Sequence, residues 1–398
     1  MIDPTDLGCA HQPAHYIGPL QDKISSQALD ADESRSVDPK VIAAIKKNDV
    51  MRISASPELG GLDESMSAIA DELSATAAAC TSTAWCLWNH LCTFHLFCGL
   101  LGPKHIDFLG DITNRHQWVC FPAGATSKVS GKNMNDTVTL DGVAAFGSGA
   151  RYADWAGVIF NDGDDENPNM QFTMADLSDA NVRVDPTWEA MSVRASATDH
   201  IYYEGLQTPR SRVVPFPDVS RHILRDQNYH VINPRYREDW VTLSVLWLGA
   251  MAVGVADSCL KETTENIRER VAIFGTKMAE RTTIHTNVGR ARALINAARD
   301  TVYAACQETD ARIAAKKIPT ESDYCRQNSA GMQAVLLCDD AMRLTLRVLG
   351  GNGLREGTAF ERRYRDFQAM PLHINGHQDR ITELTGRHSL GLETNSPI

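Results

Sequence analysis

Long helical segments fill the chain after Pro234, and they limit its fold more than any other feature of the sequence. Apolar residues recur there at helix spacing, over stretches well beyond the average helix of about 11 residues. The predicted helices cover residues 240–261, 263–276, 283–307 and 322–349. Long helices joined by short links pack as an antiparallel bundle. We therefore expect a C-terminal four-helix bundle in residues 226–398.

A region of different texture precedes these helices. Between residues 117 and 216, short runs such as 137–140 and 158–160 are β-branched or alternate in polarity. Turn signals such as Asp141-Gly142 separate them, which is typical of β-strands. A length of about 100 residues suits one domain. We expect a β-barrel or β-sandwich domain in residues 117–225.

The sequence before residue 117 has apolar residues at helix spacing, which predicts helices. Its most apolar stretch, residues 84–101, contains Asn89, His90 and His95, which makes it too polar for a membrane span and favours a buried helix. We expect an N-terminal helical domain in residues 1–116, and an α+β fold class for the whole chain. No membrane partner is predicted.

Composition narrows the functional classes. The net charge of −11 argues against a nucleic-acid partner, because such a surface must be basic to replace counterions. The first 20 residues contain acids and histidines instead of a basic start and an apolar run, which predicts no signal peptide. The 10 cysteines form no CxxC pair and suggest no metal site. We expect reduced thiols in a cytoplasmic protein.

The strongest motif lies near the end of the predicted bundle. Gly350, Gly351 and Gly353 form a GGxG turn, and an ERxxRD segment with Arg365 and Asp366 follows it. The pair of motifs resembles the C-terminal signature of the acyl-CoA dehydrogenase superfamily. Because the order of helical, β and helical regions also agrees, the resemblance covers most of the chain. It implies a flavin cofactor, with FAD expected and FMN as the alternative.

Further stretches resemble elements that hold the flavin in that family. Residues 145–149 resemble the strand beside the flavin ring, residues 193–198 resemble an R-x-S-x-T segment, and Arg270 with Phe274-Gly275 resembles an RxxFG element that reaches a neighbouring subunit's cofactor. Glycine backbones and an arginine fork suit a pyrophosphate, and hydroxyl groups suit the flavin edge. The implied cofactor-binding residues are Ser127, Ser148, Ser196, Arg270, Gly350, Gly351, Gly353 and Arg365.

The expected reaction depends on a missing carboxylate. Many acyl-CoA dehydrogenases place a glutamate shortly after the arginine–aspartate pair, but residues 371–377 contain His373 and no acid. The segment up to His373 is similar to that of dibenzothiophene and hydroxyphenylacetate monooxygenases of this fold. His90 and His95 resemble the second histidine of those enzymes. A histidine can donate a hydrogen bond or accept a proton near neutral pH, although a buried histidine can equally be a core residue.

Two other features favour the oxygenase interpretation. The loop at residues 121–127, with Pro122 and Gly124, resembles that of the monooxygenases, and Trp85, Trp88, Phe94 and Phe97 would give a dry aromatic wall. The same aromatic residues would also suit ordinary core packing.

We therefore expect a flavin-dependent oxygenase with His373, His90 and His95 as candidate catalytic residues. Its expected partners are molecular oxygen and a small, aromatic substrate, free or as a CoA thioester. A separate flavin reductase and a homotetramer or homodimer are also expected. One alternative is an acyl-CoA dehydrogenase or oxidase with its base at Glu238 or Asp239, and another is a binding subunit without catalysis.

Overall fold

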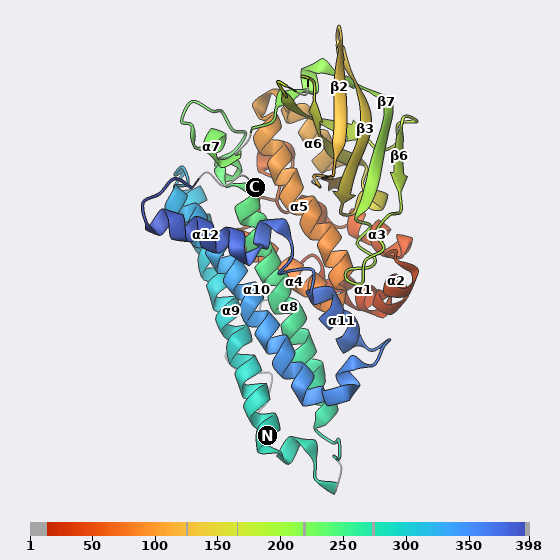
Figure 1. Cartoon of the computed structure of the whole chain (residues 1–398), viewed down its shortest axis with the longest axis vertical. Coiled ribbons are helices and arrows are strands. Elements are labelled where there is room, and N and C mark those ends of the chain that lie inside the picture. Colours follow the sequence, from red (N-terminus) through yellow and green to blue (C-terminus); the bar gives the residue numbers. More distant parts are fainter. Residues whose placement is uncertain (1–13, 125, 165, 218–219, 273–274, 395–398) are drawn as a thin grey trace.

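The computed structural model describes residues 14–124, 126–164, 166–217, 220–272 and 275–394. The protein consists of helices and one sheet. The sheet lies at one end, and the longest helices extend from it (Figure 1). The helices before the sheet are α1 (Gln21–Ser26), α2 (Ala28–Ser34), α3 (Pro39–Lys46), α4 (Met66–Ala79), α5 (Thr81–Leu101) and α6 (Ile106–Asn114).

The strands between residues 119 and 215 form one sheet in the order β6-β7-β3-β2-β4-β5-β8, with β1 paired to β4. They are β1 (Val119–Cys120), β2 (Lys128–Met134), β3 (Thr137–Gly147), β4 (Trp155–Asn161), β5 (Met170–Asp176), β6 (Val182–Asp185), β7 (Asp199–Pro209) and β8 (Val214–Pro215). The hydroxyls of Thr173 on β5 and Thr208 on β7 lie 3.1 Å apart, although these strands are not neighbours in the sheet. The sheet therefore curls over its own apolar core.

The helices after the sheet are α7 (Ser220–Arg225), α8 (Trp240–Ile267), α9 (Thr282–Ala314), α10 (Glu321–Leu349), α11 (Ala359–Phe367) and α12 (Gln378–Ser389). Helices α8, α9 and α10 pack side by side, α4 packs along α8, and α12 packs against α10 (Figure 1). The order of helices, sheet and long helices agrees with the α+β fold class expected from the sequence.

One predicted helix is wrong. Among the described residues of the segment 263–276 no separate α-helix forms, because α8 continues through Thr263 to Ile267. The expected break after Lys261 contains no glycine or proline, so nothing interrupts the helical hydrogen bonds there. The link from α8 to α9 contains a β-bridge between Val271 and Lys277 and a short 3-10 helix, Met278–Glu280.

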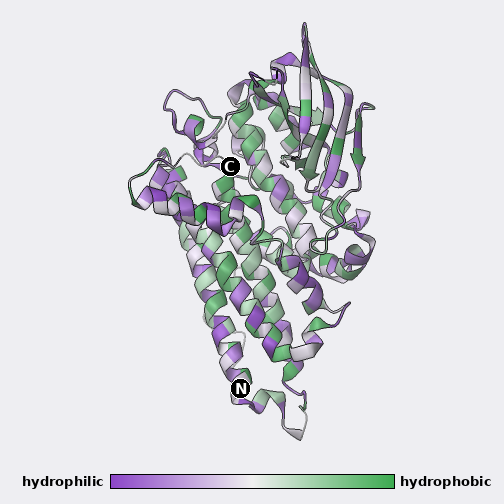
Figure 2. Cartoon of the chain, viewed as in Figure 1, coloured by the Kyte–Doolittle hydropathy of each residue, from purple (hydrophilic) through white to green (hydrophobic). Residues whose placement is uncertain are grey.

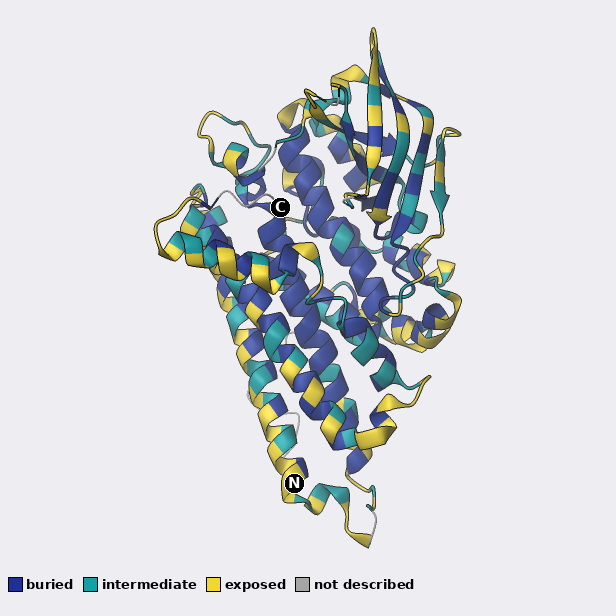
Figure 3. Ribbon diagram, viewed as in Figure 1, coloured by how far each residue is buried: buried dark blue, intermediate teal, exposed yellow. Residues whose placement is uncertain are grey.

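Two apolar helices, α5 and α8, form the centre of the molecule (Figures 2 and 3). Every residue of α5 except Asn89 is buried, so the buried helix expected at residues 84–101 is confirmed. Helix α8 is long and apolar enough to cross a membrane by composition, but 89% of its most apolar window is buried inside the protein. It serves here as a core helix.

Nine described cysteines are free, and all of them are buried. Burial raises the pKa of the Cys86 and Cys92 thiols far above the ordinary value. Within the described residues, no group of three or more histidines, cysteines or acids is arranged to hold a metal ion.

Close backbone contact between α8 and α10 should make Gly331 sensitive to substitution. A Cβ at Gly331 would lie 2.4 Å from the carbonyl oxygen of Val245, whereas one at Gly289 in α9 would meet no atom within 4 Å. We expect Gly331→Ala to lower the free energy of unfolding by about 1–3 kcal/mol through overpacking. Gly289→Ala should raise it by about 0.5–1 kcal/mol through helix propensity. Urea unfolding of both variants tests this, and equal stability of Gly331→Ala and the wild type would contradict the packing argument.

Candidate active site

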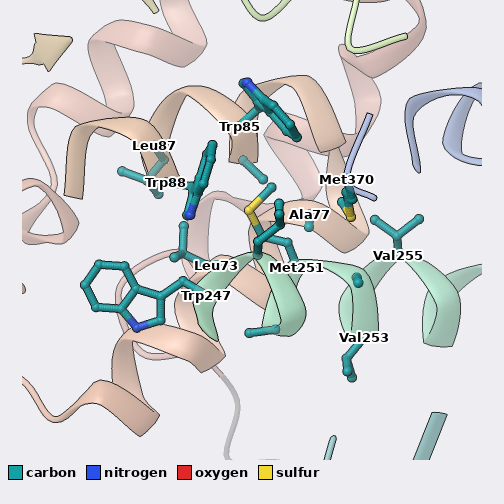
Figure 4. Close-up of a cluster of buried hydrophobic side chains, with 14 of the residues drawn as sticks. Leu73, Ala77, Trp85, Leu87, Trp88, Trp247, Met251, Val253, Val255 and Met370 are labelled. Carbon is teal, nitrogen blue, oxygen red and sulfur yellow. The ribbon is translucent and has the colours of Figure 1, made fainter. Parts of the chain in front are cut away.

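Three rings from distant segments meet beside the central helices. Trp85 and Trp88 lie three residues apart on α5, so they share one helix face. The ring of His373, from the segment between α11 and α12, lies 5.5 Å from Trp85 and 4.8 Å from Trp88, in edge-to-face contact with both. Figure 4 shows the two indoles above Met251 of α8 in this view. We call Trp85, Trp88 and His373 the aromatic group.

The aromatic group is fixed to α8 through Ser244. The indole Nε1 of Trp88 donates to the backbone oxygen of Ser244 at 2.9 Å. The side-chain amide of Asn375 donates to the Ser244 hydroxyl, also at 2.9 Å, and the backbone N–H of Asn375 donates to Nδ1 of His373 at 3.3 Å. Ser244 and Asn375 are fully buried, whereas His373 is half-buried. Burial, together with the positive charge of Arg380, lowers the pKa of His373 to about 4.

A chain of hydroxyl groups joins the aromatic group to the sheet. Nε1 of Trp85 donates to the Ser148 hydroxyl at 3.1 Å. That hydroxyl lies 3.0 Å from the hydroxyl of Thr198, which lies 2.7 Å from that of Ser196. Ser148 and Thr198 stand at the adjacent ends of β3 and β7. We call Ser148, Thr198 and Ser196 the hydroxyl chain.

The loop at residues 121–127 is tied to the same end of β3. The Ser127 hydroxyl accepts a hydrogen bond from the backbone N–H of Ala145 at 2.9 Å. Next to it, Phe146 is 50% exposed with φ of 63°, and its ring contacts the ring of Trp188 at 6.1 Å. A large aromatic side chain held out to solvent beside buried hydroxyls provides both requirements of a flavin ring, an apolar face and polar groups for its edge. The residues present therefore fit a flavin. Ala125 lies outside the described residues.

His90 and His95 are not brought to the aromatic group. Nε2 of His90 bonds the Met51 carbonyl at 2.9 Å, and its Nδ1 accepts from the Val119 backbone at 3.1 Å, so both ring nitrogens are used within the core. Nε2 of His95 bonds the Glu238 carbonyl at 2.8 Å, and its ring lies beside Tyr236. Burial lowers the pKa of His90 to about 4 and that of His95 to about 3. The structure thus places both histidines in the core, and their catalytic role stays a prediction.

Arg365 holds the chain together instead of offering its charge to a ligand. Its guanidinium forks onto the Asp32 carboxylate at 3.0 and 2.7 Å, and it also bonds Glu361 and the Met191 carbonyl. All three guanidinium nitrogens thus have partners inside the chain. Within its own subunit Arg365 forms structural ion pairs, and its support of cofactor phosphates stays a prediction.

The remaining predicted residues lie elsewhere. Arg270 belongs to the link between α8 and α9, and Gly350, Gly351 and Gly353 form the turn after α10, both at the end of the bundle away from the sheet (Figure 1). Gly350 and Gly351 are exposed, with open space where a Cβ would stand. The structure does not bring these residues to the hydroxyl chain of their own subunit. Phe274 lies outside the described residues.

The two carboxylates considered as alternative bases have other partners. Glu238 is buried and forms a two-pronged pair with Arg312 at 2.8 and 2.7 Å. Asp239 caps α8 by accepting from the backbone of Val241 at 2.8 Å, and it accepts from the Ser220 hydroxyl at 2.6 Å. Neither carboxylate is left to abstract a proton from a substrate.

The sequence does not predict Ser244 or Asn375 as site residues. Asn375 stands two residues after His373, and an asparagine next to a glycine is ordinary turn chemistry. Ser244 is one small polar residue in an apolar helix, and a sequence pattern gives it no signal.

Comparison with known proteins agrees with this architecture. Residues 246–378 match the family model described as "Acyl-CoA dehydrogenase, C-terminal domain". Among curated proteins, the chain is 22% identical to the pigment production hydroxylase of Rhodococcus sp. (strain ATCC 21145), over 94% of this chain and 95% of that protein. It is 23% identical to the oxygenase component of the FADH(2)-dependent resorcinol hydroxylase of Rhizobium sp. (strain MTP-10005), over 98% of each.

A solved structure shows the same fold. XiaF from Streptomyces sp., in complex with FADH2 and glycerol, superposes with a TM-score of 0.86 at 18% sequence identity. The match covers 96% of this chain and 95% of XiaF, so it includes all three regions.

The two core histidines predict acid sensitivity. Both stay neutral in the folded protein down to about pH 4 or below, whereas the unfolded chain takes up their protons near 6.5. Stability is therefore fully present above pH 6.5 and falls as the pH drops from about 6.5 to 4, by up to about 1.4 kcal/mol per pH unit for each histidine. In His90→Gln we expect the free energy of unfolding to fall less steeply with decreasing pH, by up to about 1.4 kcal/mol per pH unit. Urea unfolding across this pH range measures the slope, and an unchanged slope would show that His90 is not neutral when folded.

Proposed function

We propose that this chain, which has the fold of the acyl-CoA dehydrogenases, is the oxygenase component of a flavin-dependent monooxygenase that acts on a small aromatic compound. One observation carries the proposal. The aromatic group is joined through Trp85 to the hydroxyl chain, so a histidine and two indoles stand beside hydroxyls suited to a flavin edge.

Each part of the site has a role in such a reaction. A reduced flavin supplies the chemistry by reacting with oxygen and passing one oxygen atom to the substrate. Ser148 and Ser196 orient the flavin ring, while Ser127 holds the loop beside it and Phe146 covers an apolar face. Trp85 and Trp88 exclude water and give flat surfaces to an aromatic substrate. His373 contacts both indoles and presents its ring to the reacting atoms.

The contacts of Glu238 and Asp239 favour this proposal over the dehydrogenase. Desaturation of a thioester needs a carboxylate that takes the proton next to the carbonyl. A buried ion pair with Arg312 and a helix cap occupy the two acids. The names of the two curated relatives, a hydroxylase and the oxygenase component of a hydroxylase, support the same choice.

The cofactor and partners follow from the same evidence. We propose FAD, with FMN as the alternative, because the names of the resorcinol hydroxylase and of the XiaF complex both include FADH2. A separate flavin reductase would supply it in reduced form. Exposed Gly350 and Gly351, together with Arg270, suit the cofactor phosphates of a neighbouring subunit, so we propose a homotetramer or homodimer. A cytoplasmic location is part of the proposal.

Rapid mixing tests the function. The protein with reduced FAD, or FMN in parallel, should give on mixing with oxygen a transient absorbance before oxidised flavin appears, and phenols should be hydroxylated. We expect Ser148→Ala to weaken binding of reduced flavin about tenfold, a loss of about 1.4 kcal/mol typical of a buried hydrogen bond. Thr208→Val removes a buried hydroxyl pair elsewhere in the sheet and should leave flavin binding unchanged.

Two results would contradict the proposal. Bound flavin that is reduced by acyl-CoA thioesters, with no transient on mixing with oxygen, would indicate a dehydrogenase. Failure to bind either flavin in excess would indicate a binding subunit.

A further inference from the structure

The hydrogen bond to His373 decides which of its nitrogens carries the proton. In a neutral imidazole one ring nitrogen is a donor and the other an acceptor. Nδ1 of His373 accepts from the backbone N–H of Asn375 at 3.3 Å, in the cap of the short 3-10 helix Ile374–Gly376. The proton of the neutral ring therefore sits on Nε2.

Asn375 is itself held by contacts that fix its orientation. Its side-chain amide donates to the Ser244 hydroxyl at 2.9 Å, and that hydroxyl donates onward to the Val241 carbonyl at 3.0 Å. Since the Ser244 proton is used on Val241, its oxygen can only accept from Asn375, which sets the amide nitrogen toward α8. Arg380 also holds the same short helix, by donating to the Ile374 carbonyl at 3.1 Å and to the Asn375 carbonyl.

These contacts form a closed circuit. His373 packs on Trp88, Trp88 bonds the Ser244 backbone, Ser244 bonds Asn375, and Asn375 bonds His373. A half-turn of the imidazole about its Cβ–Cγ bond would break the bond at Nδ1. The ring is thus held in one orientation before any ligand enters.

We propose that Asn375 and Ser244 are positioning residues that fix His373 as a hydrogen-bond donor through Nε2, so that the histidine gives this reaction a permanent N–H group and not a base. The proposal rests on the proposed function, since the N–H must meet an oxygen atom of the reacting centre or of a phenolic substrate. The acceptor nitrogen, which a base would need, is already occupied by Asn375. The low pKa of His373 agrees, because a neutral ring keeps the same single donor through the physiological range.

The first test reads the tautomer directly, without flavin. Protein labelled with ¹⁵N-histidine gives distinct nitrogen resonances for a protonated and an unprotonated ring nitrogen, and the His373 signals are those lost in His373→Gln. We expect a protonated Nε2 and an unprotonated Nδ1 across about pH 6 to 8. The opposite tautomer, or a doubly protonated ring, would overturn the proposal whatever the enzyme does with oxygen.

The second test removes the hydrogen bond between Asn375 and Ser244 of α8. Ser244→Ala removes the acceptor of the Asn375 amide but keeps the backbone oxygen that holds Trp88. We expect His373 to show a mixture of tautomers in this variant. Thr242→Val is the matched control, because Asn328 donates to the buried Thr242 hydroxyl at 3.1 Å on the same helix. If Ser244→Ala leaves the tautomer as fixed as Thr242→Val does, Ser244 has no positioning role.

The third test separates a donor from a base. His373→Gln keeps an N–H near the position of Nε2 but cannot take up a proton, whereas His373→Leu offers neither. We expect product formation per flavin oxidised to stay within about tenfold of wild type in His373→Gln and to fall about a hundredfold or more in His373→Leu, as for loss of a preorganised donor. Equal loss in both variants would assign the histidine a proton-accepting role and overturn the proposal.

The tests also separate this proposal from the proposed function. If wild-type protein forms no product with any phenol but its His373 shows the fixed tautomer, the positioning stands and the assigned reaction fails. If product forms and the tautomer is mixed, the reaction stands and the positioning fails.

Discussion

Close packing around α8 is the constraint on which the rest of the structure depends. Glycines let its backbone approach α4 and α10, where a Cβ at Gly254 or Gly331 would collide with carbonyl groups. Helix α8 also carries Ser244, which bonds both Trp88 and Asn375. Because one rigid helix anchors both residues, the position of the candidate site is set by the core and not by surface loops.

The second organising contact is the bond from Trp85 to Ser148. It crosses from the helical core to the sheet, so one indole links the two halves of the site. On one side lie rings that would contact a substrate, and on the other lie hydroxyls that would contact a cofactor. Preorganised polar groups at a water-poor site are what oxygen chemistry on a flavin requires of its protein.

Much of this could be predicted from local patterns. Helix periodicity and turn signals indicated the order of regions, and a motif next to His373 drew attention to that residue. Spacing cannot tell which face of α5 meets the site, so it groups His90 and His95 with His373, although Nε2 of each bonds a backbone carbonyl in the core. The ion pair of Arg365 with Asp32 and the hydrogen bond of Asn375 to Ser244 join residues far apart in sequence. Such contacts exist only once the chain has folded.

The buried cysteines have a consequence for the lifetime of such a protein. Reactive oxygen species that escape from a flavin attack thiolates, and a buried thiol with a raised pKa hardly forms one. Nine described thiols are enclosed in this way, several of them on the same helix as Trp85 and Trp88. The fold would thus shield its own sulfur atoms from the oxidant made beside them, so that repeated turnover need not damage the catalyst.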